Sequence, residues 1–240
     1  MTSHTAAAHT PGAPGHDEGH GQAHVHHHYT TTGLDNRKIA IWTFIGSECM
    51  LFASLISTYL IYKGKSVVGP YPHEAWTSET GQHFNAILDI PVTSASTFVL
   101  LMSSLAMVLA LQAVQLKGSP LPANASWWQR SQRSSQFWLA ATAVMGATFL
   151  GFQAYEFPSF VHEGLTLTTN LFGSSFFTLT GFHGAHVTVG VLWLMTLLWI
   201  DRTRGLSGTN DELLVDICAL YWHFVDVVWI AIFTLIYLIQ

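Results

Sequence analysis

The chain has 240 residues, of which half are hydrophobic and only a tenth are charged. Soluble domains carry about a quarter charged residues, so this composition is typical of a membrane protein. The formal net charge of −5 comes without a basic patch and gives no indication of a nucleic-acid partner. The two cysteines, Cys49 and Cys218, lie in separate apolar stretches without a C-x-x-C motif, which argues against a cysteine-ligated metal centre.

Residues 1–36 differ in composition from the rest of the chain. They are rich in His, Gly, Ala, Pro and Thr, and they hold eight of the 14 histidines, some of them in the stretch HVHHHYTTTG. No apolar core of a secretory signal is present. We therefore predict a disordered, His-rich cytoplasmic tail over residues 1–36 and a transmembrane domain over residues 37–240. Metal collection by the tail is an alternative to solvated low complexity, which composition favours.

Five segments are long and apolar enough to cross a bilayer, which takes about 20 mostly apolar residues in a helix. They cover residues 39–62, 92–116, 137–157, 172–200 and 213–239. The links between them carry Gly, Pro and polar residues, as in KGSPLPANAS and DRTRGLSGTNDE. Short links make neighbouring helices antiparallel. We therefore predict an all-α polytopic membrane protein with its five transmembrane helices in one bundle.

Lysine and arginine residues are distributed unevenly over the two sides of this bundle. Seven belong to one side: Arg37, Lys38, Lys117, Arg130, Arg133, Arg202 and Arg204. The other side has Lys63 and Lys65. The positive-inside rule then predicts a cytoplasmic N-terminus and a C-terminus outside.

Six ionisable side chains stand out inside the predicted spans: Glu48, Glu156, His183, His186, His223 and Asp226; Asp216 lies near an interface, where it can reach water, and has less weight. At membrane depth each costs roughly 2.5–3.5 kcal/mol on insertion scales, so each requires a partner or a role. Glu48, in FIGSECMLF, has two interpretations. It is either a site linked to protons or lipid headgroups, or a neutral carboxyl that is hydrogen-bonded within the bundle.

The stretch GFHGAHVTVG places His183 and His186 one helical turn apart, on a single helix face. Gly181, Gly184 and Gly190 lie close by, and small residues permit the close approach of another helix in a membrane. We predict these three glycines to be helix-packing positions.

His223 and Asp226 also share a helix face, so the imidazole and the carboxyl are expected to contact each other or a common partner. His183 and His223 lie at comparable depths in antiparallel spans, so a haem held between two imidazoles is an alternative. A di-iron site requires Glu-x-x-His motifs, which the spans lack. Satisfied hydrogen bonds between helices are the favoured interpretation.

Other function classes find little support in the sequence. No nucleophile elbow, phosphate loop or dinucleotide fingerprint occurs, and neither broken helices nor inverted repeats indicate a transporter. No catalytic residue and no metal ligand are therefore predicted in this chain. A b-type haem membrane protein and a proton-linked transporter are the alternatives from a different class.

Four stretches resemble, in order and spacing, successive motifs of subunit III of the haem–copper respiratory oxidases: FIGSECMLF, FLGFQAYEF, GSSFFTLTGFHGAHVTVG and YWHFVDVVWIAIFTLIY. The resemblance runs from about residue 40 to the C-terminus and leaves the His-rich tail outside. Glu48 matches the intramembrane glutamate of the family, and Glu156 matches the acid of its Q-x-x-E-[FY] turn. The remaining matches are in the two C-terminal motifs: His183, His186, His223 and Asp226.

The resemblance implies a five-helix form of this subunit, which lacks two N-terminal helices of longer relatives. It implies a V-shaped cleft that holds phospholipid, with the matched residues lining the cleft or locking its helices. It implies no haem or copper in this chain and a main contact with subunit I, which carries the redox centres. Subunit II, further small subunits and a respiratory supercomplex are other implied partners. The implied location is a bacterial plasma membrane or an organellar inner membrane.

The resulting expectation is an accessory, non-catalytic subunit of a proton-pumping cytochrome c oxidase that supports proton uptake and stabilises subunit I. The third subunit of a quinol oxidase and the relative that accompanies nitric oxide reductases are the alternatives within this family. The sequence also departs from the pattern, with IPVTSAST where longer relatives have P-L-L-N-T. The paired histidines of the same helix are missing from LMSSLAMVLALQAV, so its lipid contacts are expected to differ.

Overall fold

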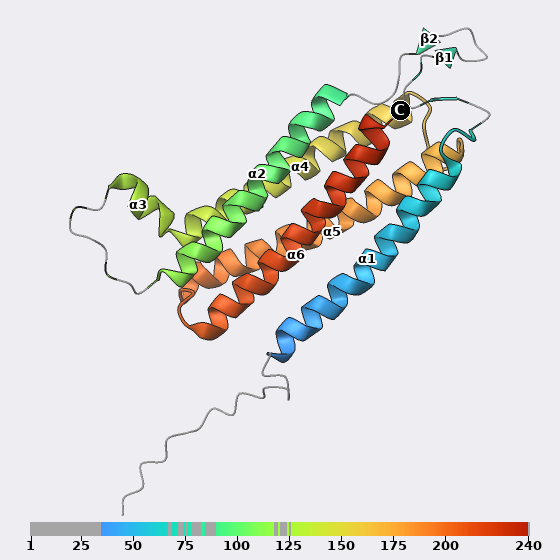
Figure 1. Ribbon diagram of the computed structural model, residues 1–240. Coiled ribbons are helices and arrows are strands. Elements are labelled where there is room, and N and C mark those ends of the chain that lie inside the picture. Colours follow the sequence, from blue (N-terminus) through green and yellow to red (C-terminus); the bar gives the residue numbers. More distant parts are fainter. Residues whose placement is uncertain are drawn as a thin grey trace, which may run out of the picture.

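The computed structural model describes residues 35–66, 69–71, 74, 76–77, 83–84, 90–117, 120, 124 and 126–239. Within these residues, five helical segments are long and apolar enough to cross a membrane (Figure 1). They are α1 (Asn36–Tyr62), α2 (Ile90–Gln115), α4 (Ser135–His162), α5 (Leu171–Thr203) and α6 (Thr209–Phe233), the last continued by the π-helix η1 (Thr234–Leu238). The predicted all-α bundle of five spans is therefore confirmed. The predicted tail lies outside the described residues up to residue 34.

Three short elements occur in the links, and the sequence did not predict them. Helix α3 (Trp127–Gln132) precedes α4. Strand β1 (Trp76–Thr77) pairs antiparallel with β2 (His83–Phe84) between α1 and α2. Because each strand has two residues, this ribbon leaves the all-α class unchanged.

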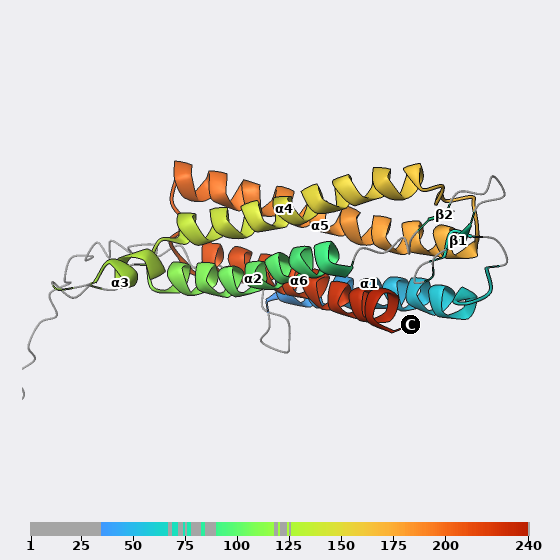
Figure 2. The same cartoon turned by 90° about the horizontal axis from the view of Figure 1, so that it is seen from above.

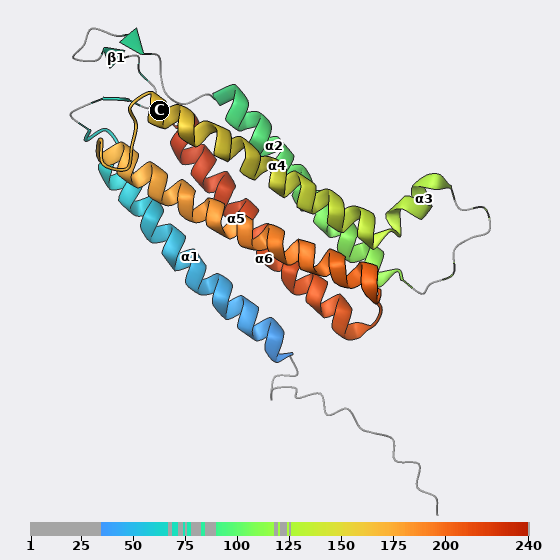
Figure 3. The same ribbon diagram turned by 180° about the vertical axis from the view of Figure 1, so that it is seen from behind.

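The five spans form two layers, with α4 and α5 in one and α2, α6 and α1 in the other (Figure 2). Figure 1 looks onto the layer of α2, α6 and α1, and Figure 3 looks onto α4 and α5 from behind. Helix α6 contacts α1, α2 and α5, and half of its apolar window is buried. Helix α1 contacts α5 and α6, and only 11% of its window is buried. Helix α6 is thus central, and α1 lies at the edge.

Helix α4 continues past the position where the sequence predicted its end. The predicted span stops at residue 157 because Pro158 lacks the amide hydrogen that a helix interior uses. In the structure α4 runs through Pro158 to His162. Phe160 beyond the proline is 3% exposed and packs edge-on against Phe176 of α5, with ring centroids 5.6 Å apart. This packing keeps the last turn helical, as is common for proline in transmembrane helices.

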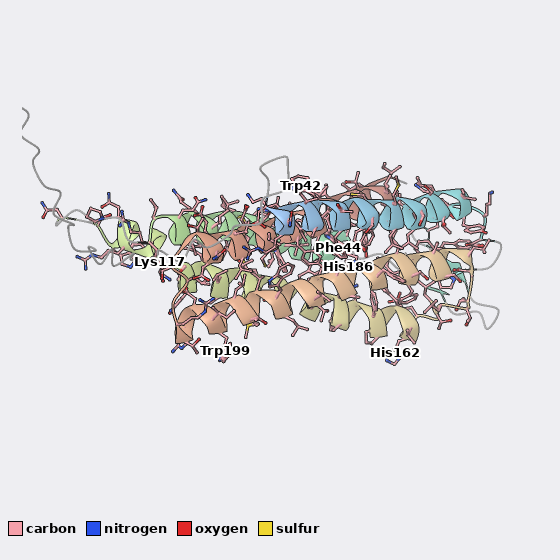
Figure 4. The ribbon with its side chains drawn as sticks, turned by 90° about the horizontal axis from the view of Figure 1, so that it is seen from below. Trp42, Phe44, Lys117, His162, His186 and Trp199 are labelled. Atoms are coloured by element: carbon pink, nitrogen blue, oxygen red, sulfur yellow. The ribbon has the colours of Figure 1, made fainter. Side chains whose placement is uncertain are left out.

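One end of the bundle is formed by Asn36, Gln115, Ser135, Thr203 and Thr209, and we call it the basic end. The seven lysine and arginine residues of the predicted cytoplasmic side lie on or beside it. The other end, the distal end, is formed by Tyr62, Ile90, His162, Leu171 and Leu238. Lys117 and His162 mark the two ends in Figure 4.

A buried carboxylate, Asp201 near the end of α5, joins several segments at the basic end. It is 2% exposed. Its side chain accepts hydrogen bonds from Lys117 Nζ and Ser135 Oγ, both at 2.5 Å, and from the Leu206 amide at 2.8 Å. Lys117 follows α2, Ser135 begins α4, and Leu206 lies in the link from α5 to α6. One carboxylate therefore fixes three chain segments relative to α5.

Candidate functional site

Five of the six predicted site residues lie in the central part of the membrane: His183, one turn before His186 on α5, and the four residues that lie nearest the middle. Glu48 is near the middle of α1, His186 near the middle of α5, and His223 and Asp226 near the middle of the α6–η1 span. With a rise of about 1.5 Å per residue, each lies roughly 20 Å from either end of its helix. At this depth water is scarce, so the partner of each group decides what it does.

Glu48 and His186 form a pair that joins α1 to α5. Glu48 Oε2 lies 3.1 Å from His186 Nε2, and the two side chains are 17% and 16% exposed. The other ring nitrogen, Nδ1, lies 2.8 Å from the Phe182 carbonyl oxygen, which only accepts hydrogen bonds. Nδ1 therefore donates to this carbonyl, and Nε2 is the ring nitrogen that faces the carboxyl group. Figure 4 shows His186 midway along the bundle, where α5 faces α1.

His183 is enclosed by aromatic rings inside the bundle and has no exposed surface. Its ring lies 4.7 Å from that of Trp229 and meets Phe149 edge-on at 5.7 Å. Its Nε2 lies 3.3 Å from the Val225 carbonyl oxygen of α6 and therefore carries the hydrogen. Nδ1 has no hydrogen-bond partner among the described residues. His183 thus joins α5 to α6.

His223 and Asp226 do not hydrogen-bond each other, but Ser104 of α2 lies beside both side chains, as the expectation of a common partner allows. His223 Nδ1 lies 2.6 Å from Ser104 Oγ of α2. Asp226 is 3% exposed, and neither of its carboxyl oxygens has a hydrogen-bond partner within the described part of the chain. His223 therefore joins α6 to α2.

Glu156 lies apart from the other five residues, toward the distal end of α4. It accepts a hydrogen bond from Thr93 Oγ1 of α2 at 2.8 Å. It also lines a cavity of about 10 Å³ together with Gln153, Thr180 and Tyr237, which is about the size of one water molecule. The six matched residues therefore form a central layer and a separate polar site rather than one cluster.

The three predicted packing glycines differ in their surroundings. A Cβ at Gly190 would lie 2.8 Å from the Trp222 ring of α6, and one at Gly184 would lie 2.5 Å from the Gln153 side chain of α4. Gly181 differs from the expectation, because a Cβ there would meet nothing within 4 Å. Gly146 of α4 was not singled out in the sequence, yet its Cβ would lie 2.5 Å from Trp222. Trp222 thus fills the space that Gly146 and Gly190 leave.

His183 and His223, the alternative pair of haem ligands, have different surroundings. His183 lies between Phe149 and Trp229 in the interior, whereas His223 faces Ser104 at the contact of α2 with α6. Among the described residues, no three His, Cys, Asp or Glu side chains are grouped closely enough to hold a metal ion. The histidines of residues 1–34 lie outside the description, so metal collection there stays a prediction.

Sequence analysis missed the partners that α2 supplies to these groups. Four hydroxyl-bearing residues of α2, which we call the α2 hydroxyls, bond side chains of α4 and α6: Thr93, Thr97, Ser103 and Ser104. Their partners are, in the same order, Glu156, Trp229, Trp222 and His223. The signal was present in the sequence, since these hydroxyls interrupt an otherwise apolar span at helical spacing.

Comparison with known proteins shows which family has this arrangement. The family model described as cytochrome c oxidase subunit III matches residues 18–240. The match begins inside the predicted tail, so it extends the resemblance that the motifs alone placed from about residue 40.

Relatives from several bacteria match most of the chain. Cytochrome c oxidase subunit 3 of Bacillus sp. strain PS3 is 39% identical over 85% of this chain and 86% of its own length. Quinol oxidase subunit 3 of Bacillus subtilis strain 168 is 34% identical over 83% and 85%. Cytochrome bo(3) ubiquinol oxidase subunit 3 of Pseudomonas aeruginosa strain PAO1 is 33% identical over 94% and 93%.

These relatives include subunits of both cytochrome c oxidases and quinol oxidases, so they define the family and leave the oxidase type open. The family match covers nearly the whole chain, and the five apolar helices agree with a subunit that crosses the membrane several times. The chain therefore belongs to the cytochrome c oxidase subunit III family, as a multi-pass membrane subunit that associates with the other subunits of a haem–copper oxidase.

Proposed function

We propose that this chain is the non-catalytic subunit III of a proton-pumping cytochrome c oxidase, in which it supports proton uptake and the stability of subunit I. Haem and copper belong to the partner subunits in this proposal, with subunit I as the main contact and subunit II beside it. Cytochrome c is the proposed donor because the Bacillus sp. strain PS3 relative, at 39% identity, is named as a cytochrome c oxidase subunit. A quinol oxidase is the second candidate, supported by the Bacillus subtilis relative at 34% identity.

The observation that carries the supporting role is how the mid-membrane imidazoles are used. Each is bonded to another helix: His186 to Glu48 of α1, His183 to the Val225 carbonyl of α6, and His223 to Ser104 of α2. Bonds of this kind fix helices relative to one another at a depth where water does not compete for the same groups. They suit a rigid subunit that supports its neighbour.

A depression at the basic end supports the proposal that this subunit binds phospholipid. It has a volume of about 390 Å³ and opens between α1, α2 and α6. Its lining includes Lys38 and the carboxyl groups of Asp35, Glu212 and Asp216. Lys38 Nζ lies 2.6 Å from Asp216, and this ammonium group together with the carboxyl groups supplies both charge signs, which fits a zwitterionic headgroup. Lipid analysis of the purified complex tests this, because Lys38→Ala should lower the copurifying phospholipid, whereas Lys65→Ala at the distal end should not.

The charge distribution supports a cytoplasmic basic end, with the distal end outside the bacterial plasma membrane or organellar inner membrane. Single cysteines introduced at Ser126, beside the basic end, and at Lys65, beside the distal end, test this orientation. In intact cells a membrane-impermeant maleimide should label Lys65→Cys and should label Ser126→Cys only after the cells are opened. The reverse pattern would overturn the orientation.

The function itself is tested on the complex purified through a tag on this chain. A haem-bearing subunit should copurify, and oxygen consumption should be faster with reduced cytochrome c than with a quinol. A complex purified without this chain should begin at nearly the same rate and lose activity much sooner. A haem band in the isolated chain, or no haem-bearing partner in the purification, would overturn the proposal.

A further inference from the structure

We propose that the outer face of α2 and α6 is the surface on which a transmembrane helix of another oxidase subunit docks, with His223 as its polar anchor. This inference rests on the proposed function, since it assigns one face of the bundle to the partner. We call this surface the α2–α6 face and define it by Leu101, Ser104 and Val108 of α2 and Leu220, His223 and Val227 of α6.

The α2–α6 face is open along its length. Leu101, Val108 and Val227 are 40%, 49% and 63% exposed. Leu220, His223 and Ser104 are partly buried, because α2 meets α6 there. Figure 1 looks onto this side of the molecule, where the two helices lie in one layer.

The spacing of these residues suits a third helix. On both helices the steps along the face are three residues and then four, as in Leu101, Ser104 and Val108. This repeat gives the seam along which left-handed helix pairs pack, in membranes as in water. Because α2 and α6 run antiparallel, their two seams form one shallow track that crosses the bilayer.

His223 places in this track a ring nitrogen that requires a hydrogen-bond partner. One ring nitrogen is bonded to Ser104, and the other, Nε2, has no hydrogen-bond partner among the described residues. The ring lies near the centre of its span, where acyl chains neither donate nor accept hydrogen bonds. Polar groups at this depth face protein or water rather than lipid. An open apolar face holds little water at the centre of the bilayer, so the group that satisfies Nε2 comes from another polypeptide.

Hydroxyl groups on the outward faces of α1, α4 and α5 do not require a partner from another chain. Thr43 and Ser54 of α1 donate to carbonyl oxygens of their own helix, as do Thr148 of α4 and Thr196 of α5. Their hydrogen-bonding capacity is met locally, so lipid can cover them at little cost. This difference favours the α2–α6 face over the outer faces of α1, α4 and α5.

The occupant is a transmembrane helix that presents one hydrogen-bonding side chain at mid-membrane, among apolar residues that fill the track. The Ser104 hydroxyl both donates and accepts, so the imidazole presents Nε2 as donor or as acceptor, according to its partner. The chain belongs to a subunit family whose members associate with other oxidase subunits, and this supplies the source of the helix.

Photo-crosslinking in native membranes tests the proposal with a matched pair of positions. Benzoylphenylalanine is placed at Val227 on the α2–α6 face or at Val189 on the outer face of α5, where valine is 63% and 54% exposed respectively. The Val227 probe should yield an adduct with another oxidase subunit, and the Val189 probe should not. A subunit adduct from Val189 alone would overturn the proposal, as would adducts from Val227 to lipid alone or to a second copy of this chain.

Substitutions give a second readout on the assembled enzyme. Val227→Trp should lower the haem recovered per tagged chain several-fold, whereas Val189→Trp should leave that ratio unchanged. His223→Leu should lower the ratio, and His223→Gln, which keeps a hydrogen-bonding group, should restore part of it. If the unaltered chain recovers no haem-bearing partner, the proposed function fails. If the unaltered chain does recover that partner, and all four variants recover haem equally, the proposed function stands and the assignment of the α2–α6 face is wrong.

Discussion

Glu48 of α1 and His186 of α5 form a hydrogen-bonded pair near the centre of the bilayer, although they come from distant parts of the chain. The carboxyl oxygen lies 3.1 Å from Nε2, while the Phe182 carbonyl fixes the hydrogen on Nδ1. This pair gives each group a hydrogen-bond partner, which lowers the cost of burying both. Its components are separated by most of the sequence, so it also fixes the position of α1 against α5.

Loss of Glu48 should affect the lifetime of the enzyme more than its initial rate. In Glu48→Ala, His186 Nε2 loses its partner at mid-membrane, and α1, with few other buried contacts, is held less firmly. We expect oxygen consumption to begin at nearly the normal rate and to decay faster during turnover. Glu48→Gln is the control, because its amide donates to Nε2 and should preserve the lifetime. Immediate loss of turnover in a fully assembled Glu48→Ala complex would contradict this prediction.

The Asp201 network should contribute far more to stability than a similar-looking surface pair. Asp201→Ala removes the acceptor for Lys117, Ser135 and the Leu206 amide, and should cost about 2–4 kcal/mol. Asp216→Ala breaks the exposed Lys38–Asp216 pair and should cost under about 1 kcal/mol. Thermal inactivation of both variants in one detergent measures the difference. Equal losses of stability in the two variants would contradict a special contribution of the Asp201 hydrogen bonds.

Filling Gly146 should disturb the bundle, whereas filling Gly181 should not. Gly146→Leu drives a side chain into Trp222, which already occupies that space, and overpacking typically costs about 1–3 kcal/mol or more. At Gly181 a side chain enters open space, so Gly181→Leu should unfold near the normal temperature. The unfolding midpoints of the two variants check this. A normal midpoint for Gly146→Leu would mean that Trp222 moves aside easily.

The α2 hydroxyls should stabilise the fold, because they serve as hydrogen-bond partners of side chains on α4 and α6. Thr97→Val keeps the shape of the side chain but leaves the Trp229 indole N–H without its acceptor, at a cost of about 1 kcal/mol. Thr148→Val is the matched control, since among the described residues the partner of Thr148 is the Val144 carbonyl of its own helix. A lower midpoint for Thr97→Val than for Thr148→Val is the expected result.

The sequence predicted the number, type and approximate limits of the spans because lipid imposes a length and an apolar composition that are visible in one dimension. It predicted less well which side of each helix packs. In a membrane, buried and lipid-facing side chains are both apolar, so the pattern that distinguishes them in soluble helices is weak. Gly181 and Gly184 show this directly, since they look alike in sequence and only Gly184 meets another helix.

The partners of the intramembrane residues were predictable only in part. The sequence indicated that His223 and Asp226 contact each other or a common partner, but it did not indicate that the partner of His223 is Ser104 of α2. Serine and threonine occur often in apolar spans, so a single sequence does not mark those that serve another helix. The end of α4 was misplaced for a related reason, because packing of Phe160 beyond Pro158 is a tertiary effect.

The α2 hydroxyls also determine how this helix sits about its own axis. Each one meets a different side chain of α4 or α6, and the four contacts extend from near the start of α2 to its middle. Turning α2 by a single residue, about 100°, would break all four contacts at once and place hydroxyls against acyl chains. The apolar side chains of α2 make no hydrogen bonds and set no such condition on the rotation of the helix, whereas these four positions together allow a single orientation.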